Sequence, residues 1–506
     1  MNLIERHFNI LFASFLFAVI MMFAIISLDS GVFVMNFGFE YANIAQSIVE
    51  GDGFSNPFSN CETGKTAWMP PLLVYLNAMV FYLVGKTTTA FILLQFFRIA
   101  LLASGVYFIF KALDMVYPQR ASITKLVFMF VFWGFLFYHR NDIAFVNDDL
   151  GIHTFNIGLG VYLLCKLFRF NYRGIFLKFF LFLLPLSTPA LLLPVVFIIV
   201  LHFFLLLIKK LKEDGYDKLF YLSFKILPSY LLLALFVILS VSIWTLRNYY
   251  SLGSWVLLKS NARFEFYLAN IASPNGINSR SVTLLYHPND NPRICSEIRD
   301  RGGEVEWMEE VGVSPLEYIR ENKKNYLFKF KNRLVNAFLL TSSTYDNKES
   351  SLLSQKNITK LDLLEKFKVA RGNQWLFLLD KSIELGDDIE SYFTPAEIEA
   401  LRKDREIAKA FILENERGMK KIFFGFLHSG LPTLSLLLLL FIGKDRWFVL
   451  IISLFFALYL MPYVLISHVM RYQYMMIILI SLILSVMLVS IISKYSGDAA
   501  SPFRSY

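Results

Sequence analysis

Acidic side chains suited to general-base chemistry stand beside apolar segments at two places in the chain. Glu40 follows the first long apolar segment, on a stretch whose apolar residues Ile44 and Ile48 have helical spacing. Asn147-Asp148-Asp149 stands immediately before the apolar segment that begins at Gly151. A partly desolvated carboxylate can accept the proton of an attacking hydroxyl group. We therefore predict Glu40 as the first catalytic residue, with Asp148 or Asp149 as the second.

Arginines at the ends of apolar segments indicate a site for an anion. Arg247 ends one segment, and Arg471 lies in a short turn between two others. The planar guanidinium group offers donors whose geometry matches phosphate oxygens, so both are predicted phosphate ligands. Contact with lipid head groups is the alternative. Arg98 lies inside an apolar segment, where a charge is costly and is expected to be functional or paired.

Other chemistries have no support in the sequence. There is no nucleophile elbow, no phosphate-binding glycine loop with lysine, and no zinc-binding pair. His153, His202 and His287 are scattered, and we expect them to be structural. No metal site is predicted, although a divalent metal stays open.

The three cysteines, Cys61, Cys165 and Cys295, lack metal-ligand spacing. Cys61 and Cys295 could pair in an oxidising compartment, but two separate thiols are the favoured interpretation.

The elements that must position these residues are membrane helices. The chain has 506 residues, of which 56% are hydrophobic and only 18% charged, whereas soluble proteins carry about 25% charged residues. Apolar runs of nearly 20 residues predict membrane spans. We predict an all-α polytopic membrane protein of about 10–11 spans, with candidates at 8–28, 90–110, 126–138, 151–165, 175–187, 190–208, 226–246, 422–442, 447–467 and 473–493.

The charges orient these spans. Residues 29–69 carry five acidic side chains against Lys65 alone, whereas the loops 111–125 and 166–178 are rich in Lys and Arg. Lys/Arg-rich short loops stay in the cytoplasm. Both termini are therefore expected in the cytoplasm, with the loops 29–89 and 139–150 outside. The net charge of +9 follows largely from these loops, so no nucleic acid is expected as a partner.

Two polar regions complete the predicted organisation. The stretch Pro70–Gly85 is apolar but short for a span, and counting it as one would reverse the charge pattern, so we predict an interfacial or re-entrant helix. The chain divides into a transmembrane module at 1–246, an extracytoplasmic, mainly helical segment at 247–421, and transmembrane helices with a cytoplasmic tail at 422–506. Within the second segment, we interpret residues 343–417 as an insertion and assign it no role.

This pattern resembles the GT-C glycosyltransferases, and within them a bacterial branch of family 39, which holds protein O-mannosyltransferases and the aminoarabinose transferase of lipid A. The resemblance rests on five blocks in order: Phe39-Glu40 with Ile44-Ala45; Gly51 to Phe58; Thr63 to Trp68 with Pro70-Pro71; Trp244-Thr245 and Arg247-Asn248 with the Glu265 region; and His468 with Arg471-Tyr472. The chain departs from the family where Phe37 and Gly38 replace the usual neighbouring acid, and where Met475 and Met476 stand in place of a frequent proline.

The resemblance implies a function. Such enzymes transfer a sugar from a polyprenyl-phosphate donor on the extracytoplasmic face, here of a bacterial inner membrane, to a lipid, glycan or protein acceptor. Glu40 and Asp148 or Asp149 would be the loop acids, and Arg247, Arg471 and His468 the donor-phosphate ligands. Tyr41, Lys65 and Asn248 would line the substrate loop. The mechanism expected is an inverting transfer.

Two alternatives belong to other classes. A transporter or flippase of lipid-linked glycans would carry charged residues along its spans, whereas here the charged candidates gather at one face. A non-catalytic membrane assembly protein would use the segment 247–421 for binding and would survive loss of the outer carboxylates.

Overall fold

The described part of the chain is helical. A computed structural model describes residues 3–29, 37, 39–59, 61–118, 120–138, 148–214, 219–273, 276–277, 286–289, 291–311, 314–338, 446–467 and 477–495. Within these ranges the structure contains no β-strand of two or more residues, and β pairing is limited to isolated bridges such as that between Ser55 and Lys65. The predicted all-α class is therefore confirmed for these residues. The predicted span 422–442 and the insertion 343–417 lie outside them.

Four helices are long and apolar enough to cross a membrane, within the described ranges. They are α4 (Thr88–Val116), α7 (Asp148–Phe170), α9 (Leu192–Asp214), which follows the 3₁₀ turn η1 (Pro189–Leu191), and α10 (Leu219–Leu252). Each coincides with a predicted span. The other predicted spans that the structure describes are also helices: α1 (Leu3–Asp29), α5 (Ala121–Tyr138), α8 (Ile175–Ser187), α22 (Arg446–Leu465) and α24 (Ile477–Tyr495). The chain is thus a helical protein with the composition of a membrane protein.

Glycines allow α4 and α7 to pack closely side by side. A Cβ atom on Gly151 would lie 2.4 Å from the carbonyl oxygen of Arg98, and one on Gly158 would lie 2.1 Å from that of Gly105. Any larger side chain would push the helices apart, which is the usual reason for small residues between membrane helices. The paired positions rise together along both helices, so α4 and α7 are parallel. Their first turns therefore lie at the same end of the bundle.

The same end also receives the carboxyl ends of α10 and α22. Arg247, near the end of α10, contacts the loop that follows α2 (Phe39–Glu50). The last carbonyls of α22 accept hydrogen bonds from α16 (Lys323–Phe338), where Arg333 donates to the Val464 oxygen at 2.6 Å. A cation suits the negative end of a helix dipole. This end is the one that the charge pattern predicts to be outside.

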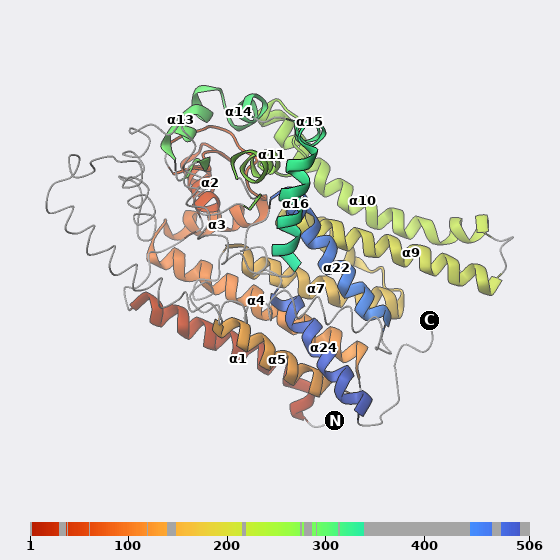
Figure 1. Cartoon of the computed structure of the whole chain (residues 1–506). Coiled ribbons are helices and arrows are strands. Elements are labelled where there is room, and N and C mark those ends of the chain that lie inside the picture. Colours follow the sequence, from red (N-terminus) through yellow and green to blue (C-terminus); the bar gives the residue numbers. More distant parts are fainter. Residues whose placement is uncertain are drawn as a thin grey trace.

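A cap of short helices covers this end (Figure 1). Its members are α2, α11 (Ala262–Tyr267), the π-helical turn η3 (Leu268–Ala272), α13 (Pro292–Asp300), α14 (Glu304–Val311) and α15 (Pro315–Glu321). Trp68 from the loop after α2, Phe264 from α11 and Trp307 from α14 are buried together in one apolar cluster. The first loop and the segment after α10 therefore share a core.

The predicted interfacial segment forms the helix α3 (Pro71–Val84), which packs against α2 and α4. Pro70 and Pro71 suit a helix start, because proline lacks the amide hydrogen that a first turn leaves unpaired. At 14 residues the helix is about 21 Å long, which is short for a bilayer core of about 30 Å. It exposes Tyr82 and Leu83, at 79% and 69% of their surfaces. Its length and this exposed apolar end agree with the prediction, and its place in a membrane stays a prediction.

Candidate functional site

The two predicted acids from distant parts of the chain meet through one tyrosine. The Tyr41 hydroxyl donates to Asp149 Oδ1 at 2.6 Å, across a sequence separation of 108 residues. Glu40 precedes Tyr41 in the first turn of α2, and Asp149 lies in the first turn of α7. The positive end of a helix dipole stabilises a carboxylate in that position. The structure therefore brings Glu40 and Asp149 to one site. Asp148 begins α7, and its side chain lies outside the described atoms.

Glu40 faces a histidine that sequence reasoning set aside. His287 Nε2 lies 3.6 Å from Glu40 Oε1, and the two side chains are 15% and 17% exposed. The backbone N–H of Asn289 donates to His287 Nδ1 at 3.3 Å. Because Nδ1 accepts that bond, the ring's hydrogen in the neutral form belongs on Nε2, toward the carboxylate. The aromatic rings of Phe58, Trp68 and Phe264 surround the imidazole and limit its rotation.

Cationic groups lie next to Asp149. Arg98 is buried in α4, donates to the carbonyl oxygen of Phe37 at 3.1 Å, and attracts the Asp149 carboxylate electrostatically. Arg98 thus has partners within the protein, in agreement with the expectation that it is paired. His153 Nδ1 lies 2.9 Å from the Asp149 carbonyl oxygen, one turn along α7. Lys259 acts electrostatically on His153, which places another cation near the acids.

Arg247 is occupied by the protein itself. Its guanidinium donates to the Thr66 oxygen at 2.6 Å and to the Phe54 oxygen at 3.0 Å, and it stacks over the rings of Phe54 and Trp244. These bonds hold the first loop on the end of α10. The predicted phosphate role of Arg247 is untested, but its geometry is that of a structural residue.

Glu304 holds the same loop from the other side. It accepts hydrogen bonds from the Thr66 hydroxyl at 2.6 Å and from the Ala67 amide at 2.8 Å, and only 2% of its surface is exposed. Burial raises the pKa of Glu304, while these hydrogen bonds and the charge of Arg247 act in the opposite direction. Nothing in the local sequence of α14 marked this glutamate as different from its neighbours.

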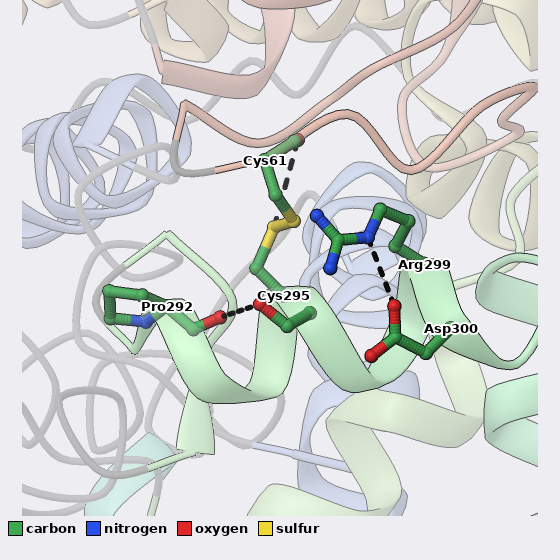
Figure 2. Close-up of polar contacts among 6 residues, drawn as sticks. Cys61, Pro292, Cys295, Arg299 and Asp300 are labelled. Carbon is green, nitrogen blue, oxygen red and sulfur yellow. Dashed lines mark hydrogen bonds and ion pairs between the residues drawn. A yellow bond between two sulfur atoms is a disulfide. The ribbon is translucent and has the colours of Figure 1, made fainter.

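A disulfide joins Cys61 of the first loop to Cys295 of α13, across 234 residues (Figure 2). Their Cα atoms are 5.9 Å apart, in the ordinary range for such a bond. The interpretation of two separate thiols is therefore wrong for this pair. The expectation failed because the two residues approach only through the shared apolar core, which leaves no trace in their spacing.

The remaining predicted residues are less informative. Lys65 is exposed and donates to the carbonyl oxygen of Asp52. Asn248 is fully buried and donates to the Val256 oxygen at 2.9 Å, so it shapes the turn after α10. His468 and Arg471 lie outside the described residues, directly after Ser467, whose hydroxyl donates to Glu265 at 3.0 Å. Among the described residues, no three His, Cys, Asp or Glu side chains are grouped to hold a metal ion.

Comparison with known proteins adds no relative. The chain matches no family model, no curated protein and no solved structure.

Proposed function

We propose that this protein is a membrane glycosyltransferase that moves a sugar from a polyprenyl-phosphate donor to a hydroxyl acceptor on the extracytoplasmic face. The observation that supports this most directly is the meeting of Glu40, Tyr41 and Asp149 at one end of the helices. Two carboxylates from separate loops, half-buried and next to cations, are what a hydroxyl-activating site at a membrane edge needs.

In the proposed reaction, Glu40 is the general base. As the acceptor oxygen bonds to the sugar C1, its proton passes to the Glu40 carboxylate. The bond between C1 and the phosphate oxygen breaks, and its electron pair stays on the departing polyprenyl phosphate. A single displacement inverts C1. His287 orients Glu40 through Nε2, while Asp149, bonded to Tyr41, positions α2 against α7.

The departing phosphate needs cations. Arg471 and His468 keep this predicted role; they lie outside the described residues, and in the sequence they follow α22, whose carboxyl end is on the side of the bundle where Glu40 lies. Arg247 then acts indirectly, by holding the substrate loop in place. Electrostatic stabilisation of the leaving group is usually a large share of such catalysis.

The proposal also assigns the protein an orientation in its membrane and a cellular location. The Cys61–Cys295 disulfide belongs to the end of the bundle that carries Glu40, and disulfides persist in oxidising compartments. This supports an extracytoplasmic site. The bacterial inner membrane and the cytoplasmic termini belong to the proposal through the family resemblance and the charge pattern of the loops.

The test uses purified protein in lipid nanodiscs with a polyprenyl-phosphate sugar. Wild-type protein should consume the donor, by transfer or slow hydrolysis, and E40Q should lose about 10²- to 10⁴-fold of that rate. E50Q is the matched control, because Glu50 is an exposed acid at the other end of α2. Full activity of E40Q would remove Glu40 from the mechanism. Donor that crosses the bilayer unchanged would favour a flippase.

A further inference from the structure

A cavity of about 400 Å³ opens at the end of the bundle opposite to Glu40. It lies among the last turns of α4, α7 and α9 and the beginning of α22. Asp149 and Arg169, at the two ends of α7, are separated by 20 residues, or about 30 Å along the axis. That distance equals the thickness of a bilayer core. The cavity is therefore separate from the proposed catalytic site.

The walls and the mouth of the cavity differ in chemistry. The walls are apolar, and Val116, Leu164, Ile452 and Phe455 are almost completely buried there. The mouth carries three cations, Arg169, Lys209 and Lys212, against the single acid Glu213. Glu213 is paired with Lys210 at 2.8 Å. The mouth is thus positive, and its volume is in the range of about 300–1,000 Å³ typical of ligand sites.

We propose that this cavity binds an acyl chain of an anionic phospholipid, whose phosphate contacts Arg169, Lys209 and Lys212. The apolar walls suit a hydrocarbon chain, and the cations complement a negative head group at the depth where head groups lie. A free phosphate would leave the apolar walls without a partner. A neutral lipid would not complement the net positive charge of the mouth. The site occupies the side that the charge pattern predicts to be cytoplasmic, and it does not depend on the proposed function.

Cys165 offers a reporter inside the cavity. It lines the wall, and it is the free cysteine of a chain that has three, the other two forming the disulfide. A lipid chain in the cavity should shield its thiol. The experiment measures the rate at which N-ethylmaleimide alkylates Cys165 in phosphatidylcholine nanodiscs that contain increasing fractions of phosphatidylglycerol. Phosphatidylglycerol should slow alkylation in a saturable manner.

The charge contribution is tested with variants of the exposed lysines. The double variant K209A/K212A should need about 25-fold more phosphatidylglycerol for half-protection, because each lysine near a head group contributes about fivefold. K225A is the matched control: Lys225 is an exposed lysine near the beginning of α10, at the same end of the bundle, and it does not line the cavity. It should stay within about twofold of wild type.

Three results would overturn the proposal. Alkylation that phosphatidylglycerol does not slow would mean that no anionic lipid enters. An equal shift in K225A would mean that the charge effect is not specific to the mouth. Protection by added polyprenyl phosphate but not by phosphatidylglycerol would make the carrier lipid the occupant in place of a phospholipid.

Discussion

Two glutamates at the same end of the molecule have opposite environments. Glu304 is almost fully buried, and Thr66 and Ala67 donate to its two oxygens. Glu40 keeps 17% of its side chain exposed and faces His287 at 3.6 Å, beyond hydrogen-bond length. A carboxylate whose hydrogen bonds are made by the protein has little capacity left for a substrate. One whose side chain stays partly exposed can still accept a proton. The comparison separates a structural acid from a candidate catalytic one.

The largest expected effect lies on the Glu40 side of this comparison. D149N should lower donor turnover by about 10²- to 10⁴-fold, because it removes the charge of the second carboxylate. Y41F, which removes the hydrogen bond to Asp149 but keeps that charge, should lose less. The measurement is the rate of donor consumption in nanodiscs, with D52N as the control acid from the exposed first loop. Equal rates for D149N and D52N would contradict the assignment.

The disulfide should have the largest effect on stability. Replacing Cys61 and Cys295 by serine should lower the free energy of unfolding by about 2–5 kcal/mol, since the bond ties the first loop to α13. Thermal unfolding of purified protein with and without reductant measures this. C165S is the control and should respond to reductant like wild type. Thiol titration in denaturant should count one reactive thiol before reduction and three after it; three before reduction would refute the bond.

Glu304 should matter for folding and not for chemistry. E304Q should cost about 1–3 kcal/mol of unfolding free energy, because the amide group places a donor against the donors of Thr66 or Ala67. The folded fraction should keep its turnover. E306Q is the control, because Glu306 lies on the same helix and is exposed. A turnover lost in E304Q beyond its loss of folded protein would place Glu304 with the catalytic acids.

The smallest expected effect is a pH dependence of stability. Burial raises the pKa of Glu304 above its ordinary value of 4.5, so the folded state holds that proton more tightly than the unfolded state. Between the pKa of Glu304 in the unfolded state and its higher pKa in the folded state, the free energy of unfolding should fall as the pH rises. The difference in Tm between wild type and E304Q, followed upward from pH 4.5, should show this slope. A difference that grows with pH in favour of wild type would have the wrong sign.

Much of the helical framework could be read from the sequence. The predicted spans 90–110 and 226–246 lie within α4 and α10, and 190–208 covers the end of η1 and most of α9, because a long apolar run is a local property. The boundaries were less accurate: 151–165 is only the middle of α7, since Asp148 and Arg169 extend the helix into polar surroundings. The short segment at Pro70–Gly85 was correctly predicted as a separate helix from its apolar composition, its length and the charge pattern of the loops.

The candidate site was predicted in part. Glu40 and Asp149 were chosen because each stands beside an apolar segment, and Asp149 accepts a hydrogen bond from Tyr41, the residue that follows Glu40. His287 and Glu304 were missed, since each gains its significance from a partner more than 200 residues away. Arg247 was predicted to face a ligand, yet its donors reach the carbonyls of Thr66 and Phe54.

The sequence by itself determined that the chain forms apolar helices of membrane length and which of their ends belong together. Hydropathy and charge act along the chain, so their pattern needs no folded structure to be read. Only the tertiary structure decided which carboxylate is enclosed and which stays open, and which cysteines bond. Those outcomes depend on contacts between the first loop and the segment after α10, where burial in a common core removes water and leaves each polar group with the partner that packing supplies.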